Sequence, residues 1–540
     1  MKHRSIIAGI LTMATLSSCS SGQRMDHSMM RHDRMMGGSD DVPETVLTQN
    51  NIDLNTLPEA KPSTILEVKN GDTIDLNPGI VKKTIDGTSF AFYAYNGQFP
   101  GPTIRVKQGS TFTVRVKNDI DQETTVHWHG IRLDNPNDGV PGVTQNAIKP
   151  GDTFTYTVKV PDEGIFWYHP HVREDIQQDM GLYGLLHVTP RSSDAYPAVD
   201  KEEYIVLDDI LLQKGMPVPH GKRSANFALM GRFGNTFLIN GNAEPPSLEV
   251  KTNTSVRYYL LNAANTRTFN VSFSEAKAKL VGGDAGRYET PQELKKKLII
   301  SPSERYIVDV LYWDARRANG VYHINPTPIE NDSGVGSRMQ TLLDVVVSPT
   351  ANDAPTANEF QAMEAHDDVI ADINNFRTYF DTPVDHTLRL TVEMAMDHGM
   401  MMHHGTESDG IEWEDTMPMM NAMATDANTQ WKLIDEATGK ENMDINYVFQ
   451  KGDKVKIRII NDADSAHPMQ HPIHFHGQRF LVLSMNGVQE KNLVWKDTVL
   501  IPKGATADIL LDASNPGEWM IHCHIAEHLT NGMMGGFTVR

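Results

Sequence analysis

Three segments of the chain share one pattern of hydrophobic and polar positions: an apolar residue, a turn, and an alternating strand that ends in asparagine. They are VKQGSTFTVRVKN (106–118), VKTNTSVRYYLLN (250–262) and FQKGDKVKIRIIN (449–461). Alternation with a period of two is typical of a strand with one buried face. Strands of this kind, densely separated by Gly, Pro and Asn, are typical of β-sandwiches. We therefore predict an all-β protein with three sandwich domains.

The positions of these segments set the predicted domain boundaries. We place the domains at about 62–192, 200–349 and 376–540. The third segment lies farther from the second than the second does from the first, and two polar stretches account for the difference. They are a linker near 350–375 and a biased insertion near 394–430. The length of 540 residues also suggests about three domains at roughly 150 residues each.

The net charge and the number of cysteines argue against two classes of protein: nucleic-acid-binding proteins and proteins stabilised by disulfides. The formal net charge of −20 argues against nucleic acid as a partner and favours a soluble body that attracts cations. The chain has only two cysteines, Cys19 and Cys523, which argues against a disulfide framework. Each cysteine therefore needs an explanation of its own.

The first cysteine follows a stretch with the properties of an export signal. MKHRSIIAGILTMATLSSC has a basic start, an apolar run and small residues before Cys19. LSSC resembles the bacterial lipobox, in which the cysteine becomes the lipidated first residue. Residues 1–19 are then a lipoprotein signal peptide and 20–61 a tether. Several acyl chains would anchor the protein stably, and Ser20 is typical of an outer-membrane lipoprotein in the periplasm. The alternative is an ordinary secretory signal with a chance cysteine.

Ten of the 22 histidines fall into four short clusters. The clusters are HWHG (His127, His129), WYHPH (His169, His171), HPIHFHG (His471, His474, His476) and HCHIAEH (His522, His524, His528). Residues i and i+2 of a strand share one face, so each HxH directs two imidazoles to one place. Exposed histidine pairs on surface strands are the alternative, which four clusters together disfavour. The clusters predict metal binding.

The second cysteine lies between two histidines in HCH, and strand alternation turns it away from both of them. It can therefore bind one metal while its neighbours bind another. A thiolate, two imidazoles and a weak thioether are the ligands of blue-copper electron-transfer sites. Cys523, His528 and Met533 supply three of these donors, and His471 is the natural second imidazole. A structural zinc site is the alternative, but it would leave the remaining histidines unused.

These motifs resemble those of a known family. HWHG, HPH, HPIHFHG and HCHxxxHxxxxM are similar, in order and spacing, to the four copper motifs of the laccase-like multicopper oxidases. The resemblance spans the whole mature chain. It implies three cupredoxin-like Greek-key β-sandwich domains, four copper ions, and a reaction in which four single electrons reduce O₂ to two waters.

The resemblance also implies a ligand set for each copper. The sets are His471, Cys523 and His528 with axial Met533 for type 1 copper; His127 and His474 for type 2; His129, His169 and His524 for one type 3 copper; and His171, His476 and His522 for the other. The three-copper cluster then lies between domains 1 and 3. Pro170 stands in domain 1 where Cys523 stands in domain 3, and Asn325 takes the ligand position in domain 2. Domain 2 is therefore expected to hold no copper.

Oxygen reduction consumes protons, and Asp138 in NDGVPG is the predicted acid near the cluster. It matches an acidic residue that family members place there. An aspartate before Gly139 is also typical of a turn, and it can serve both roles. Some bacterial relatives have a glutamate directly after the last type 1 histidine. Leu529 occupies that position here, so a second proton donor is not identified.

Methionines gather before the copper motifs of domain 3. They are Met394, Met396, Met400, Met401, Met402, Met417, Met419, Met420 and Met423. They are mixed with polar residues and form no helical stripe, so we predict a flexible loop that offers thioethers to Cu(I). The segment resembles the Met-rich cover of cuprous oxidases, in which Met469 matches a substrate methionine, although His467 replaces an aspartate. The tether repeats the theme in MDHSMMRHDRMM. A low-complexity insert without a role is the alternative.

The predicted function is that of a lipid-anchored, monomeric copper oxidase of the bacterial cell envelope. It would oxidise Cu(I) in copper tolerance, with O₂ as the electron acceptor. A laccase that oxidises phenols or aromatic amines is an alternative, because the type 1 ligands do not select the reductant. A copper-sequestering protein with a vestigial oxidase site is a second alternative, which the complete histidine set disfavours. A copper nitrite reductase would lack the full type 3 set.

Overall fold

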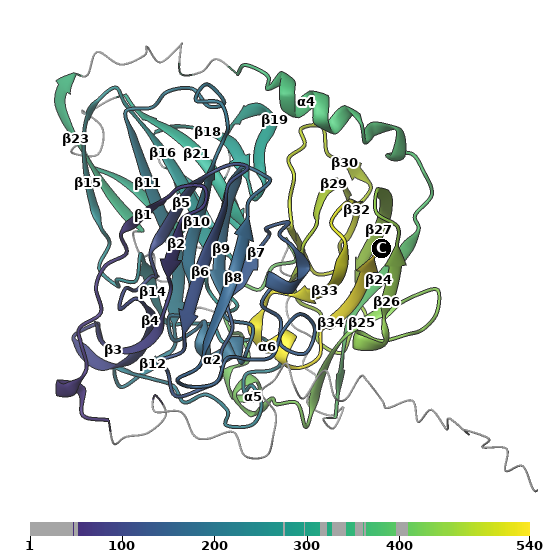
Figure 1. Cartoon of the computed structure of the whole chain (residues 1–540), viewed down its shortest axis with the longest axis horizontal. Helices are drawn as coiled ribbons and strands as arrows, with labels where there is room; N and C mark the ends of the chain where they lie inside the picture. Colours follow the sequence, from purple (N-terminus) through teal and green to yellow (C-terminus); the bar gives the residue numbers. More distant parts are fainter. Residues whose placement is uncertain are drawn as a thin grey trace, which may run out of the picture.

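A computed structural model describes residues 52–273, 276–295, 297–313, 321–326, 342–351, 363–395 and 409–540, together with Leu47 and Phe360. Strands dominate the described chain and helices are few and short, so the predicted all-β class is confirmed. Figure 1 shows the blue strands of the N-terminal part beside the teal strands of the middle part, with the yellow-green C-terminal strands on the right. Among the described residues, no helix is long and apolar enough to cross a membrane.

The first domain pairs a five-stranded sheet, in the order β1-β5-β10-β9-β7, with a three-stranded sheet β2-β6-β8 and a hairpin β3-β4. Its elements are β1 (Ile65–Val68), β2 (Thr73–Asp75), β3 (Pro78–Ile85), β4 (Thr88–Tyr95), β5 (Thr103–Lys107), β6 (Thr111–Lys117), β7 (His127–His129), β8 (Thr153–Lys159), β9 (Gly164–His169), α2 (Glu174–Gln177) and β10 (Gly184–Thr189). Strand β9 is buried on both faces, which explains its continuous apolar sequence GIFWY.

The second domain packs a six-stranded sheet, β14-β11-β16-β21-β18-β19, on a five-stranded sheet, β15-β23-β22-β17-β20, beside a hairpin β12-β13. Its strands are β11 (Lys201–Ile210), β12 (Leu212–Gln213), β13 (Met216–Pro217), β14 (Thr236–Ile239), β15 (Ser247–Thr252), β16 (Thr254–Asn262), β17 (Phe269–Phe273), β18 (Lys277–Gly283), β19 (Gly286–Glu293), β20 (Leu298–Ile300), β21 (Arg305–Tyr312), β22 (Val321–Pro326) and β23 (Leu343–Ala351). Val, Ile, Leu and aromatic side chains of both sheets fill its core.

The third domain has the same plan, with sheets β25-β24-β27-β32-β29-β30 and β26-β34-β33-β28-β31. Its elements are α4 (Asp367–Asn374), β24 (His386–Met394), α5 (Pro418–Met423), β25 (Thr429–Asp435), β26 (Asn446–Phe449), β27 (Asp453–Asn461), β28 (His471–Phe475), β29 (Arg479–Met485), β30 (Val488–Gln489), β31 (Thr498–Ile501), β32 (Thr506–Ala513), β33 (Gly517–Cys523), α6 (Ala526–Thr530) and β34 (Met534–Val539). Helix α6 lies beside α2 of the first domain in Figure 1, and the two are in contact.

The asparagine that ends each aligned segment has the same structural task in all three domains. Asn118, Asn262 and Asn461 are almost fully buried at the ends of β6, β16 and β27. Each donates side-chain hydrogen bonds to at least two backbone carbonyl groups, as Asn118 does to Gln122 and Ile148 at 2.7 and 2.8 Å. A buried amide must be satisfied in this way, so the shared residue reflects a shared strand-to-loop turn.

Two segments predicted to be irregular contain helices. Helix α4 lies within the linker predicted at 350–375, and its acidic first turn suits a helix N-terminus. Helix α5 ends the segment predicted as a flexible methionine loop, so the prediction is wrong for 418–423. Pro418 at the first turn favours the helix start, and the buried Asn421 side chain donates to Gly231 and Asp415. Residues 396–408 lie outside the described residues.

Partly buried charged side chains join the first and third domains. Arg132 of the first domain binds Asp162 with two hydrogen bonds of 2.6 and 2.7 Å, and it also donates to Ser514 of the third domain. Arg479 of the third domain lies 3.6 Å from the same Asp162 carboxylate. Burial acts to raise the pKa of Asp162, but Arg132 and Arg479 hold it below its usual value. The interface between these two domains contains the candidate site.

Candidate metal centre

Eight histidines meet where the first and third domains join. Strand pairing brings them together: His127 on β7 lies opposite His169 at the end of β9. In the third domain, His474 on β28 lies opposite His522 on β33. The other members of the cluster either share a strand with these or follow directly after its end; they are His129, His171, His476 and His524. All eight are buried, with exposures of 3% or less.

Most of these imidazoles use one ring nitrogen to hold the ring in place. Nδ1 lies within hydrogen-bond distance of a carbonyl oxygen in four of them. The pairs are His127 with Asp138 (2.7 Å), His169 with Pro170 (2.9 Å), His474 with Asp497 (2.8 Å) and His522 with Cys523 (2.8 Å). Carboxylates take this place for two others, Asp138 for His476 at 2.8 Å and Glu174 for His171 at 2.7 Å. Partners of this kind fix the tautomer and the orientation of a metal-binding histidine.

The opposite ring nitrogens are directed at one another. Among the described residues, six of them have no hydrogen-bond partner: His127 Nε2, His129 Nδ1, His169 Nε2, His171 Nε2, His474 Nε2 and His524 Nε2. The remaining two, Nε2 of His476 and of His522, lie 2.9 Å apart. Nitrogen atoms of this cluster fall within 4.8 Å of one another in overlapping groups of three. Buried, unsatisfied imidazole nitrogens that converge on one space are the donor set for metal ions.

The electrostatics of the cluster keep most of the imidazoles neutral. Burial lowers the pKa of His129, His169, His476, His522 and His524 well below the usual range, and neighbouring histidines add to the effect. For the pKa of His171, burial is outweighed by Glu174, which raises it. A neutral imidazole has a free lone pair, which is the form that binds metals.

Two glycines allow the backbone to approach the histidines closely. Gly130 of HWHG has φ +81°, and a Cβ there would lie 2.2 Å from the Asp497 carboxylate. Gly139, after Asp138, has φ +82°, and a Cβ there would lie 2.0 Å from the carbonyl oxygen of Val126. Both positions therefore require glycine for their conformation and for space.

A second group of donors lies inside the third domain. The Cys523 thiol is 3.6 Å from His471 Nδ1 and 3.8 Å from His528 Nδ1, and these two nitrogens are 3.3 Å apart. All three residues are buried. As predicted from strand alternation, Cys523 points into this group while its two neighbours point into the eight-histidine cluster. Met533 is fully buried in the same core as Cys523.

Burial also sets the protonation of this second group. It lowers the pKa of His471 to about 3 and raises the pKa of the Cys523 thiol. A buried thiol is a poor acid without a metal, and metal coordination deprotonates it outright. Trp431 stacks on His528 with a ring separation of 4.0 Å and donates a hydrogen bond to the carbonyl of Ala228 in the second domain. The Cys523 group is thus closed by residues of two domains.

The C-terminal part of the methionine segment covers this group. Glu412 and Gln470 exchange hydrogen bonds of 2.8 and 2.9 Å, which places the segment beside His471. Arg267 of the second domain binds Glu414 with two hydrogen bonds. The predicted substrate methionine Met469 is fully buried in the same core.

The predicted segment methionines differ in exposure. Met394, Met417 and Met420 are partly buried against the third-domain core, whereas Met419 and Met423 are 82% and 64% exposed. The predicted Met396, Met400, Met401 and Met402, like Cys19, lie outside the described residues.

Three residues beside the cluster were not identified from the sequence. They are Glu174, Asp497 and Arg305, all buried. Glu174 directly follows HPHVR in the sequence, so its proximity to a histidine motif could have identified it as a partner of the cluster. Asp497 and Arg305 lie in ordinary strand-forming segments, and no local pattern distinguishes them from structural charges. Asp138, in contrast, contacts two histidines of the cluster, and it also follows the turn Asn135–Asn137. Its role as an acid stays a prediction.

The donor chemistry fits copper at both groups. One thiolate with two imidazoles is the blue-copper set, and a cluster of converging imidazoles suits copper as well. Three β-sandwich domains with these two groups define a copper-dependent oxidoreductase. Family models described as multicopper oxidase match residues 81–193 and 413–540. These matches support a place in the laccase-like multicopper oxidase family, whose cofactor is copper.

Individual relatives agree with this result. The multicopper oxidase mco of Staphylococcus aureus is 27% identical over 456 residues, which cover 82% of this chain and 83% of the relative. Copper resistance protein A of Escherichia coli is 24% identical, with 86% and 92% covered. Laccase-1 of Cryptococcus neoformans is 25% identical, with 84% and 78% covered. The crystal structure of a multi-copper oxidase from Pseudomonas thermotolerans matches with a TM-score of 0.64 and 27% identity, over 88% of this chain and 100% of that one.

Proposed function

We propose that this multicopper oxidase oxidises Cu(I) to Cu(II). Four Cu(I) ions each give one electron, and O₂ takes four electrons and four protons to form two waters. The observation that carries the proposal is the enclosure of the Cys523 group. His471, Cys523 and His528 have exposures of 1% or less. A bulky aromatic reductant therefore cannot contact the edge of either histidine ring of this group.

The cover over that group has the chemistry that selects cuprous ion. Met417 and Met420 pack against the core that contains Cys523, and Met469 lies within that core. Thioethers are soft ligands that favour Cu(I) over harder cations. The exposed thioethers of Met419 and Met423 on α5 offer a first contact for the ion at the surface. Residues 396–408, with their further methionines, continue the same composition.

We assign the ligands of the resident coppers as the sequence predicted. The Cys523 group would hold type 1 copper, with Met533 as a further donor, and the eight-histidine cluster would hold the type 2 and type 3 ions. Bound copper supplies the one-electron redox chemistry. Cys523 lies next to His522 and His524 in the chain, so covalent bonds connect the site of electron entry to the cluster. Burial of both groups excludes water from competing reactions.

Asp138 is the proposed acid of the cluster. Its Oδ2 lies 2.8 Å from His476 Nδ1, and among the described residues its Oδ1 has no hydrogen-bond partner. This position beside the cluster suits a residue that supplies protons to O₂. Leu529 is buried against Val140, Met520 and Met534, so the position after His528 supplies no acid.

The proposed location is the periplasmic side of the cell envelope, with a lipid anchor at Cys19. The relative named copper resistance protein A supports a role in copper tolerance. Metabolic labelling with a fatty acid should mark the wild-type protein and not the Cys19→Ala variant. An unlabelled wild-type protein would show that the chain is exported without an anchor.

A side-by-side measurement of O₂ uptake tests the substrate. The copper-loaded protein is supplied with Cu(I) or with a phenol, and kcat/KM is compared. We expect the larger kcat/KM for Cu(I). A Glu414→Gln variant, which weakens the contact of the cover with Arg267, should raise phenol oxidation and leave the copper content unchanged. A larger kcat/KM for the phenol in the wild-type protein would favour a laccase, as the relative named laccase-1 allows.

A further inference from the structure

Two pairs of stacked imidazoles lie between the first and third domains, and an aspartate contacts each pair. In the first pair, His127 and His476 stack at 4.1 Å between ring centres. The Asp138 carbonyl oxygen lies 2.7 Å from His127 Nδ1, and its carboxylate lies 2.8 Å from His476 Nδ1. One first-domain residue therefore orients a histidine of its own domain through the backbone and a histidine of the other domain through its side chain.

The second pair repeats this arrangement with the domains exchanged. His129 and His474 stack at 3.7 Å with an interplanar angle of 18°. The carbonyl oxygen of Asp497, a third-domain residue, lies 2.8 Å from Nδ1 of His474 in its own domain. Its carboxylate Oδ1 lies 3.0 Å from Nε2 of His129 in the first domain. Asp497 is therefore the counterpart of Asp138 on the other side of the cluster.

The two aspartates differ in what holds their carboxylates. Asp497 accepts hydrogen bonds from both terminal nitrogens of Arg305, at 2.8 Å to Oδ1 and 2.5 Å to Oδ2. Both side chains are completely buried. The ion pairs of Asp138 among the described residues are with His127 and His476 alone. A bidentate arginine fixes the direction of its carboxylate, so Asp497 is held in place by Arg305 and Asp138 is not held in this way.

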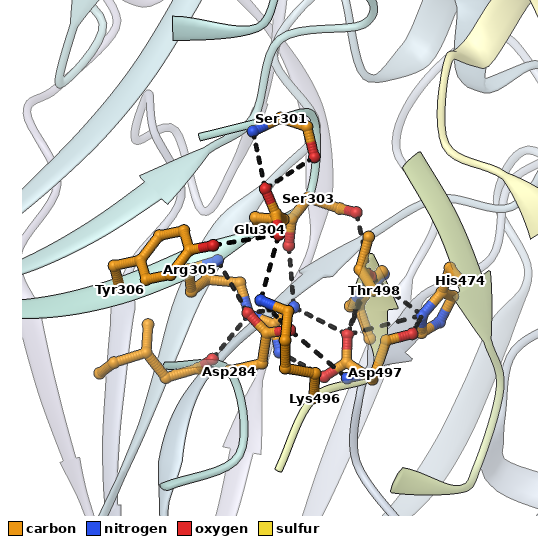
Figure 2. Close-up of polar contacts among 12 residues, drawn as sticks. Asp284, Ser301, Ser303, Glu304, Arg305, Tyr306, His474, Lys496, Asp497 and Thr498 are labelled. Atoms are coloured by element: carbon orange, nitrogen blue, oxygen red, sulfur yellow. Dashed lines mark hydrogen bonds and ion pairs between the residues drawn. The ribbon is translucent and has the colours of Figure 1, made fainter. Parts of the chain in front are cut away.

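Arg305 belongs to the second domain, which has no predicted copper ligand. It begins strand β21, and its remaining donors bind the carbonyls of Ile165 in the first domain and Ser303 in its own, at 2.7 and 2.8 Å. Figure 2 shows Arg305 between Asp284 and Asp497, with Thr498 and His474 beyond Asp497. The guanidinium therefore contacts all three domains at one point.

The same figure shows the other charges of this network. Lys496 lies 3.3 Å from Asp284 and 3.1 Å from Glu304, so the second and third domains share a second buried ion pair beside the first. Ser301 donates two hydrogen bonds to Glu304, at 2.9 and 3.0 Å, and fixes that carboxylate. The position of Arg305 is thus set by several contacts and not by Asp497 alone.

We propose that Arg305 and Asp497 are a positioning pair. Through this pair, the copper-free second domain sets the tautomer of His129 and holds the stacked rings of His129 and His474 in the orientation that binds copper. The proposal rests on the assignment of both histidines as copper ligands. His129 is unusual in the cluster because its Nδ1, not its Nε2, faces the other donors. A neutral imidazole has one N–H, and donation of that N–H from Nε2 to Asp497 leaves the Nδ1 lone pair free.

The requirement for Gly130 agrees with this role. A Cβ at Gly130 would lie 2.2 Å from Asp497 Oδ2 and 3.0 Å from Arg305 Nη2. The ion pair thus occupies the space directly behind His129. The backbone of the HWHG motif therefore passes so close to Asp497 and Arg305 that only glycine fits at position 130.

Two variants test the positioning pair. Asp497→Asn removes the charge with almost no change in size and keeps the backbone carbonyl that contacts His474. Arg305→Met removes the bidentate partner. Loss of an outer partner of a metal-binding histidine typically weakens metal affinity about 10–100-fold. We expect this loss for the cluster coppers in both variants, measured by metal analysis after dialysis and by electron paramagnetic resonance of type 2 copper. The blue absorption of the Cys523 group should remain.

A matched control is available on the neighbouring strand β16 of the same sheet. Arg257 binds Asp309 of β21 with two hydrogen bonds of 2.7 and 2.8 Å, both side chains are buried, and neither contacts a histidine of the cluster. Arg257→Met therefore removes an equivalent buried arginine and should leave the cluster copper in place. Arg305→Lys retains the charge without the bidentate geometry and should show an intermediate loss.

The outcomes separate this inference from the proposed function. Full cluster copper with an unchanged type 2 spectrum in Asp497→Asn would overturn the positioning role, and so would equal copper loss in Arg305→Met and Arg257→Met. A wild-type protein that binds only the copper of the Cys523 group would instead overturn the assignment of the cluster and, with it, the proposed function.

Discussion

The two candidate copper groups are assembled in different ways. His471, Cys523 and His528 belong to one domain and span 57 residues of sequence, between the paired strands β28 and β33 and the helix α6. The eight-histidine cluster draws its members from two domains, and one of its contacts, His129 with Asp497, joins residues 368 positions apart. The first group therefore depends on the folding of one sandwich, whereas the second also depends on how three domains dock.

This difference explains where the buried charges lie. The Cys523 group is surrounded by apolar and aromatic side chains such as Trp431, Ile473 and Phe475. The cluster is flanked by ion pairs that cross domain boundaries, including Arg305 with Asp497 and Arg132 with its third-domain neighbours. Directional contacts fix the relative position of domains more strictly than apolar contacts do. Because the two candidate copper groups depend on different contacts, disruption of one group should leave the other intact.

The largest expected effect comes from Cys523→Ser. Loss of the thiolate should abolish the blue absorption and the oxidase activity, because electrons enter at that group. Metal analysis should still find about three coppers per chain, since the eight histidines are unchanged. Cys19→Ser is the matched control, and its purified protein should stay blue and active. A blue Cys523→Ser protein would refute the type 1 assignment.

The next largest effect is expected for Asp138→Asn. Removal of a positioned acid typically costs about 10²–10⁴-fold in rate, and O₂ uptake should fall within this range. The copper content should be retained, because the amide oxygen can still accept from His476 Nδ1 and no buried arginine loses its partner. This result would be the opposite of that for Asp497→Asn, which should lose cluster copper. Asp134→Asn changes an exposed aspartate of the same turn and should have no effect. Equal behaviour of the Asp138 and Asp497 variants would remove the distinction between the two residues.

Arg132→Met tests the dependence of the cluster on domain docking. Loss of a hydrogen bond to a charged group costs about 1.5–3 kcal/mol, and the partly buried Arg132 links Asp162 to the third domain. We expect a lower Tm and weaker cluster copper, with the blue absorption preserved. The control is Arg115→Met, whose exposed pair with Asp75 lies within the first domain and contributes about 0–1 kcal/mol. Parallel loss of both copper groups would show that they are not independent.

The smallest expected effect concerns the methionine segment. Replacement of 396–408 by a short Gly/Ser linker leaves the anchors Glu414 and Asn421 in place. The KM for Cu(I) should rise with little change in kcat, because four thioether side chains are removed and the proposed copper ligands are not. Phenol oxidation should be unchanged or faster, and the spectra should be the same. An unchanged KM for Cu(I) would remove a main support for the cuprous substrate.

Local sequence was sufficient to predict where most of the candidate donor side chains gather. The period-two geometry of a strand separates Cys523 from its two neighbours, and HxH spacing alone brings two imidazoles together. The buried asparagine that ends each of the three aligned segments marks an equivalent turn in each domain. These properties follow from contacts within a few residues, which the chain encodes directly.

Tertiary structure decided the rest. No local pattern distinguishes Asp497 from other strand aspartates, because its partners His129 and Arg305 come from two other domains. The helix α5 was also not predicted, since its Asn421 is held by Gly231 of the second domain and not by helical periodicity. Interactions between distant segments depend on domain docking, and their partners become neighbours only when the whole chain has folded.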